Sequence, residues 1–99
     1  HALSYGLSYV LGTKHGLGNC LVFAQLEKFY PQGVALFFQM MKKHHITLPK
    51  LNCRTLSDTD LETMVDIAFS LEPLWENALG KDWKSQISKE EVKSIYRRL

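Results

Sequence analysis

The chain lacks the features that would place it in a membrane or in an oxidising compartment. None of its apolar runs approaches the ~20 residues that a membrane-spanning helix needs. Its two cysteines, Cys20 and Cys53, have no CxxC spacing and are too few for a disulfide framework. Cys20 lies in an apolar run and is expected to be a buried thiol. We therefore expect a reducing, cytoplasmic setting, with no membrane among the partners.

The sequence also has no starting methionine and no signal peptide. It begins at His1, within a motif that is described below, and this start favours a piece of a longer protein. At 99 residues the chain is expected to form one domain at most, with enough apolar residues for a core.

A strong charge of one sign is missing as well. The formal net charge is only +2, and the basic residues are scattered apart from two short clusters, residues 42–45 and 97–98. Both clusters fall at expected helix C-termini, where cations complement the helix dipole. This interpretation is favoured over nucleic-acid binding, so no nucleic acid is expected as a partner.

Every segment that can be interpreted has the periodicity of a helix, and no strand is compelling. The expected helices cover residues 1–11, 15–30, 33–45, 58–71, 73–80 and 88–99. Gly12 suits the end of the first, Ser57 is a good N-cap, and Ser88 with Glu91 forms a capping box. Residues 46–57 are the longest irregular stretch, and Trp83 is expected in a loop. The fold class is therefore an all-α bundle of five or six helices with short connections.

His1 and His15 are the most informative residues. They lie fourteen positions apart, about 21 Å on a continuous helix, whereas two imidazoles on one ion need their nitrogens roughly 2 Å from it. The chain must therefore turn between them, and Gly12 offers that turn because glycine accepts a positive φ. Gly16 and Gly18 would let the backbone approach a neighbour or a ligand. Two helix ends could then converge on one metal ion.

Other polar and aromatic residues have simpler interpretations. Tyr5 shares a polar face of the first helix with His1, and a role in a cleft is as plausible as packing. Asn19 is expected to be structural, bonding the backbone across a tight approach. His44 and His45 have no partner at metal-ligand spacing and are expected to be exposed at a helix end. Further residues are interpreted as packing anchors or as core or interface residues: Trp75, Trp83, Met40 and Met41.

The stretch from His1 to Asn19 resembles the iron-containing (group III) alcohol dehydrogenase family. That family has a His, ten to fourteen intervening residues, and then His-Gly-x-x-Asn at the start of a buried helix; here His1 and His15-Gly-Leu-Gly-Asn19 match. The resemblance extends loosely over the whole chain. Within the family, His-Ala-Leu-Ser-Tyr-Gly-Leu-Ser and Glu27-Lys-Phe-Tyr-Pro31 are most similar to the branch that oxidises the C8 hydroxyl of 3-deoxy-manno-octulosonate.

The resemblance implies that residues 1–99 are part of a C-terminal helical, dehydroquinate synthase-like metal-binding domain, and that the nucleotide-binding domain is absent from this chain. It implies Fe²⁺ or Zn²⁺ held by one Asp and three His, of which His1 and His15 match the last two. NAD(P) would be bound mainly by the missing upstream domain. The substrate would be a small alcohol or sugar acid, a homodimer is among the compatible assemblies, and the isolated chain would be inactive.

One position departs from the family pattern. Many members carry a second histidine four residues after the first of these ligands, facing the nicotinamide, whereas this chain has Tyr5. Tyrosine can donate a hydrogen bond or relay a proton, but its ordinary pKa is ~10 against ~6.5 for histidine. A histidine-based proton relay therefore does not carry over, and Tyr5 is the candidate catalytic residue.

Two other classes compete with the enzyme fragment. The first is a non-enzymatic helical interaction domain whose partner groove is formed by Phe37, Phe38 and Met41. The second is a helical metal sensor, which would need a full ligand set although the first acidic residue is Glu27. An interaction domain has no reason to place Gly12 between two histidines, so the opening motif favours the enzyme fragment.

Overall fold

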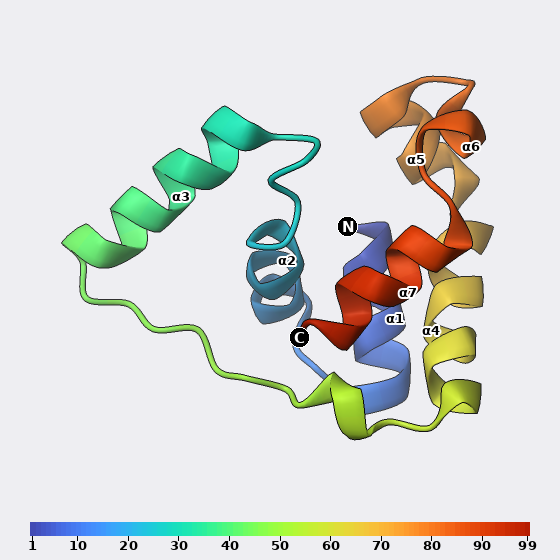
Figure 1. Ribbon diagram of the computed structural model, residues 1–99, viewed down its shortest axis with the longest axis horizontal. Helices are drawn as coiled ribbons and strands as arrows, with labels where there is room; N and C mark the ends of the chain where they lie inside the picture. The colour runs from blue at the N-terminus through green and yellow to red at the C-terminus, as the bar shows by residue number, and fades with distance from the viewer.

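The computed structural model describes residues 1–99 and contains seven α-helices, one 3-10 helix and no strand. Figure 1 shows their arrangement. The elements are α1 (Ala2–Leu11), α2 (His15–Phe23), α3 (Pro31–Lys43), η1 (Cys53–Thr55), α4 (Asp58–Ser70), α5 (Glu72–Leu79), α6 (Trp83–Gln86) and α7 (Lys89–Arg97). The all-α prediction is confirmed. The predicted number of five or six was too low, because the segment at Trp83 that was expected to be a loop forms the short helix α6.

The core is built around α1, α4 and α7, which lie side by side (Figure 1). Leu7 of α1, Met64 of α4 and Val92 of α7 are fully buried. Gly6 allows the close approach of α1 to α4, because a Cβ there would lie 2.8 Å from the carbonyl oxygen of Met64 and would clash with the hydroxyl of Tyr96. The first and last helices of the chain are therefore parts of one core.

The helix ends that the sequence predicted are present. Gly12 has φ 68° and ends α1 in the left-handed conformation. The hydroxyl of Ser57 accepts a hydrogen bond from the backbone N–H of Asp60, at 3.2 Å. The hydroxyl of Ser88 accepts one from the N–H of Glu91, at 3.1 Å. These caps satisfy backbone donors that have no partner within a helix.

Helix α2 ends at Phe23, so the prediction that it continues to Tyr30 was wrong. After Phe23 the backbone makes shorter-range bonds, from the N–H of Leu26 to the oxygen of Phe23 and from that of Phe29 to Leu26. The chain turns because Leu26 and Phe29 pack against the core. The prediction of a buried thiol at Cys20 was also wrong, since that residue is only half-buried. The cysteine that is buried is Cys53.

Helix α3 stands apart from the rest of the bundle in Figure 1. Its inner side buries Val34 and Met41. Its outer side leaves Leu36 65% exposed, and Phe38 and Met40 are exposed as well. The two methionines that were expected to be core or interface residues therefore differ. Met41 is buried in the structure, and Met40 is exposed to solvent.

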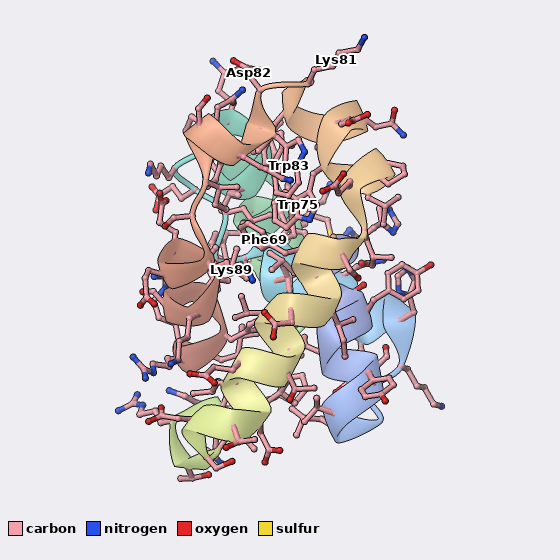
Figure 2. All side chains as sticks on the ribbon, turned by 90° about the vertical axis from the view of Figure 1, so that its right-hand side faces the viewer. Phe69, Trp75, Lys81, Asp82, Trp83 and Lys89 are labelled. Atoms are coloured by element: carbon pink, nitrogen blue, oxygen red, sulfur yellow. The ribbon has the colours of Figure 1, made fainter.

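An aromatic cluster joins α4, α5 and α6 (Figure 2). The rings of Trp75 and Trp83 stack with centroids 5.2 Å apart and planes 10° from parallel, and Phe69 packs against both. The indole N–H of Trp75 donates to the carbonyl oxygen of Ala68 at 2.7 Å, which satisfies the one polar group that this ring buries. The interpretation of both tryptophans as packing anchors is confirmed.

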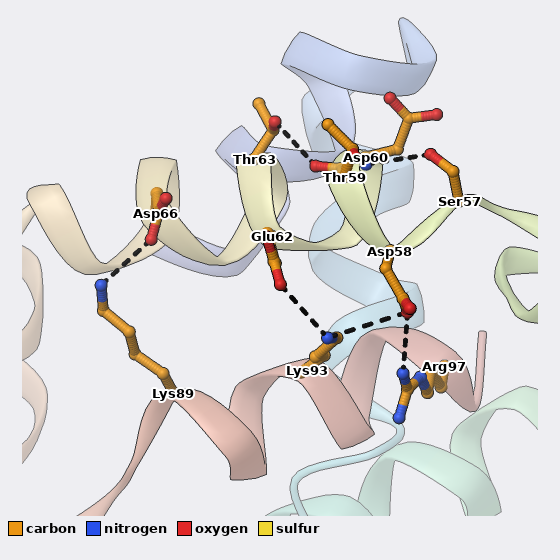
Figure 3. Close-up of polar contacts among 10 residues, drawn as sticks. All are labelled: Ser57, Asp58, Thr59, Asp60, Glu62, Thr63, Asp66, Lys89, Lys93 and Arg97. Carbon is orange, nitrogen blue, oxygen red and sulfur yellow. Dashed lines mark hydrogen bonds and ion pairs between the residues drawn. The ribbon is translucent and has the colours of Figure 1, made fainter.

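Ion pairs connect the outer surfaces of α4 and α7 (Figure 3). The ammonium of Lys93 lies 3.8 Å from carboxylate oxygens of both Asp58 and Glu62. The other pairs are Lys89 with Asp66 and Arg97 with Asp58. Exposed pairs of this kind contribute about 0–1 kcal/mol each, so they add little to the stability of the fold.

No helix in the structure has both the length and the apolar character that crossing a membrane requires.

Candidate metal site

His1 directly precedes α1, His15 is the first residue of α2, and their side chains meet. Nδ1 of His1 lies 3.1 Å from Nε2 of His15. Two nitrogens that bind one Zn²⁺ at 2.0–2.1 Å are separated by about 2.9 to 3.3 Å for angles between 90° and tetrahedral. The separation of the two rings therefore fits two ligands of one ion. The turn at Gly12 brings them together, as the sequence predicted.

Ser4 determines which nitrogen of His15 carries the proton. Its hydroxyl donates to the backbone oxygen of His1 at 2.8 Å, and its Oγ lies 2.9 Å from Nδ1 of His15. Because the single hydroxyl proton is already used, the bond to His15 must run from Nδ1–H to Oγ. In the neutral ring Nε2 of His15 then carries the lone pair, and Nε2 faces His1.

Asn19 lies on the other side of His1. Its side-chain Nδ2 is 3.4 Å from Nδ1 of His1, so the amide donates to that ring nitrogen. The expected bond from Asn19 to the backbone is not formed; its partner is a histidine side chain. Nδ1 of His1 has a single lone pair, so a metal ion bound at this nitrogen would take the place of the Asn19 hydrogen bond. The 3.1 Å contact between the two ring nitrogens is a hydrogen bond when one of them carries a proton, and it matches the spacing of two metal ligands when neither does.

Glycines allow the two helices to meet so closely. A Cβ on Gly18 would lie 3.2 Å from Cβ of Ser4, tighter than ordinary van der Waals contact. Gly18 therefore fulfils the prediction of a close approach to a neighbour. A Cβ on Gly16 would meet nothing within 4 Å, so no close approach inside the chain depends on that residue.

Tyr5 lies beside the histidine pair. Its ring centroid is 4.8 Å from that of His15, and the residue is 46% exposed. The ring is thus on the side of α1 that carries the pair and remains open to solvent. Its role in catalysis stays a prediction, with a position next to a candidate ligand in its favour.

The structure brings together two candidate ligands, His1 and His15, and no third. No group of three or more His, Cys, Asp or Glu side chains lies in an arrangement that could hold a metal ion. His44 and His45 are exposed at the end of α3, as expected, and do not join the pair. The donor set suits Fe²⁺ or Zn²⁺, since neutral imidazoles bind both, but two imidazoles leave the coordination shell incomplete.

An apolar cavity of about 540 Å³ lies beside His1. His1 and Asn19 line its edge, and twelve of its fifteen lining residues are hydrophobic. Those with the largest side chains are Phe23, Leu26, Phe29, Tyr30, Leu74 and Trp75. The sequence did not predict this cavity, because its walls come from segments more than forty residues apart. It likewise did not predict the role of Ser4, although spacings of three and four placed Ser4 on the face of His1.

No model of a known protein family matches the chain.

Proposed function

We propose that the chain is the helical, metal-binding part of an alcohol oxidoreductase, with His1 and His15 as two ligands of Fe²⁺ or Zn²⁺. The observation that carries this proposal is the 3.1 Å separation between Nδ1 of His1 and Nε2 of His15, which is the spacing of two ligands of one ion. The resemblance to iron-containing alcohol dehydrogenases supplies the rest: a dehydroquinate synthase-like helical domain, an upstream nucleotide-binding domain that holds NAD(P), and an Asp and a further His.

Each residue of the site has a role under this proposal. When bound, the metal would polarise the alcohol oxygen and lower its pKa, so that hydride can pass to the nicotinamide. His1 and His15 hold the metal through neutral imidazoles. Tyr5 can donate a hydrogen bond or relay a proton at the solvent-facing side, because its hydroxyl is on the exposed part of α1.

The substrate is a small alcohol or a sugar acid. Resemblance points to the C8 hydroxyl of 3-deoxy-manno-octulosonate. The cavity beside His1 has no Lys or Arg in its lining, so it offers no cationic partner for the carboxylate of a sugar acid. That carboxylate would need a partner outside the cavity. A panel of the sugar acid, simple primary alcohols and aryl alcohols, assayed by nicotinamide reduction, would separate these substrate classes.

The direct test measures metal content and alcohol-dependent nicotinamide reduction in a protein that contains this chain and the upstream domain. His15→Ala should abolish both, and circular dichroism should remain helical. His44→Ala is the matched control, because that exposed histidine lies at a helix end outside the site, and it should change neither. Wild-type metal content and turnover that survive in His15→Ala would reject the proposal.

The isolated chain should bind Zn²⁺ or Fe²⁺ weakly and show no turnover, because two imidazoles leave the remaining coordination positions unfilled. Isothermal titration calorimetry with each metal alone provides the measurement. Micromolar affinity together with alcohol oxidation by these 99 residues would contradict the proposal.

A non-enzymatic helical interaction domain is the second candidate. Of the three residues predicted to form its groove, Met41 is buried, Phe37 is half-buried and Phe38 is exposed. The observation that favours this class is instead the exposed outer side of α3, with Leu36, Phe38 and Met40. An interaction domain would keep its function in His15→Ala and lose it in Phe38→Lys, whereas the enzyme should show the reverse sensitivity.

A further inference from the structure

We infer that Ser4 is a positioning residue, which holds the ring of His15 in the tautomer whose Nε2 lone pair faces His1. Its value for metal binding rests on the proposed function, whereas the tautomer itself can be measured without any metal. The geometry that points to this role is one hydroxyl placed between a backbone carbonyl and an imidazole nitrogen.

The hydroxyl has only one hydrogen-bond arrangement that satisfies both neighbours. The carbonyl oxygen of His1 can only accept, so Ser4 donates to it at 2.8 Å. The oxygen of Ser4 then accepts from Nδ1–H of His15 at 2.9 Å. If the proton of His15 were on Nε2 instead, Nδ1 and Oγ would face each other as two acceptors. The tautomer of a histidine is commonly set by the hydrogen bond that its second nitrogen makes.

The position of Ser4 is itself fixed by packing. The residue is 1% exposed and is the one polar residue among the buried residues of the chain. The backbone of α2 passes directly over it at Gly18, where even a Cβ would be crowded. Bulk water therefore cannot replace the Ser4 hydroxyl as the hydrogen-bond partner of His15. Metal-binding histidines generally have such a partner on the second ring nitrogen, and its loss costs 10–100-fold in metal affinity.

A purely structural role makes a different prediction. Ser8, one turn further along α1, donates to the carbonyl oxygen of Thr13 at 2.7 Å and has no histidine partner. If Ser4 acted only as a second backbone cap of this kind, removal of either hydroxyl would lower the melting temperature and leave the imidazoles unchanged. Ser8→Ala is therefore the matched control for Ser4→Ala.

The first experiment is long-range ¹H–¹⁵N NMR of the metal-free chain, at a pH about two units above the ordinary imidazole pKa of ~6.5. Wild-type His15 should show a protonated Nδ1 and an unprotonated Nε2. Ser8→Ala should keep that pattern, and Ser4→Ala should shift His15 toward the Nε2–H form. A protonated Nε2 in the wild type, or an unchanged pattern in a folded Ser4→Ala variant, would overturn the inference.

The second experiment measures Zn²⁺ affinity by calorimetry. Ser4→Ala should weaken binding by about 10–100-fold, and Ser8→Ala should leave it unchanged. Equal affinity in Ser4→Ala and wild type would overturn the link between Ser4 and the metal. A wild-type chain with the expected tautomer but no Zn²⁺ binding, alone or joined to the upstream domain, would instead reject the proposed function, so the two failures are distinguishable.

Discussion

The hydroxyl of Tyr96 in α7 donates a hydrogen bond to the backbone carbonyl oxygen of Leu3 in α1, at 2.6 Å. This bond joins residues 93 positions apart and lies in the buried core directly beside Gly6. Leu3 is one residue before Ser4, so the last helix holds in place the turn of α1 that carries the candidate site. The stability of the core and the geometry of the site are therefore connected through this contact.

The first prediction concerns the pH dependence of stability. Burial raises the pKa of Tyr96 well above its ordinary value of ~10, with a further contribution from a charged Cys53 thiolate nearby. Above about pH 10 the unfolded chain releases a proton that the folded chain keeps, so the free energy of unfolding should fall as pH rises. The contribution is fully present below that pH. Urea unfolding at a series of pH values should show the decline.

Tyr96→Phe tests this prediction, because it removes the titrating group and retains the ring. It should cost about 1 kcal/mol near neutral pH through the lost hydrogen bond and should flatten the alkaline decline. Tyr9→Phe is the control, since Tyr9 is 76% exposed. An alkaline decline as steep in Tyr96→Phe as in the wild type would contradict the assignment.

The second prediction uses two glycines that lie in helices. Gly6→Ala should destabilise the protein by about 1–3 kcal/mol, because the new Cβ clashes with Tyr96 and with the backbone at Met64. Gly16→Ala should be neutral or stabilising by up to about 1 kcal/mol, since its Cβ meets open space and alanine favours the helix. Chemical denaturation of both variants measures the difference. Similar free energies of unfolding would show that α1 and α4 do not approach as described.

The third prediction concerns the stacked tryptophans. Trp83→Ala should lower the free energy of unfolding by about 3–5 kcal/mol, because it opens a cavity beside Trp75 and Phe69. Tryptophan fluorescence during urea unfolding gives the measurement. Leu36→Ala, on the exposed side of α3, should change the free energy by less than about 0.5 kcal/mol. A mild effect at Trp83 would mean that the cluster is not part of the cooperative core.

The fourth prediction separates the ion pairs between α4 and α7. Lys93→Met should cost more than Lys89→Met, up to about 1 kcal/mol, because Lys93 is the least exposed cation and contacts two carboxylates. The loss at Lys93 should shrink as salt is added, since screening weakens the interaction with both acids. Thermal melts at low and high ionic strength provide the measurement, and equal losses at the two lysines would contradict it.

The fifth prediction concerns Tyr5 in a protein that joins this chain to the upstream domain. Tyr5→Phe should lower kcat and leave metal content unchanged, because the ring packs beside His15 without binding the metal. Tyr9→Phe, on the same helix and more exposed, should leave kcat unchanged. Metal analysis and steady-state kinetics measure both quantities. Unchanged kcat in Tyr5→Phe would assign Tyr5 to packing alone.

Several features of the fold could be predicted because they depend on neighbouring residues. Gly12, Ser57 and Ser88 determine helix ends through local backbone conformation and side-chain caps, and all three ends were predicted. Helix α2 does not extend to Tyr30, because Leu26 and Phe29 turn the chain toward core residues far away in the sequence. Here tertiary packing overrides the local helical pattern, and no neighbouring residue in the sequence indicates that it will.

The candidate site divides in the same way. The sequence by itself determined that His1 and His15 stand on either side of a glycine turn, because glycine readily adopts the positive φ that Gly12 has. Only the tertiary structure decided the 3.1 Å separation, the orientation of His15 by Ser4 and the apolar cavity at their edge. Hydrogen-bond direction and cavity shape depend on how α1, α2 and α5 pack together, and packing joins residues that no spacing along the chain connects.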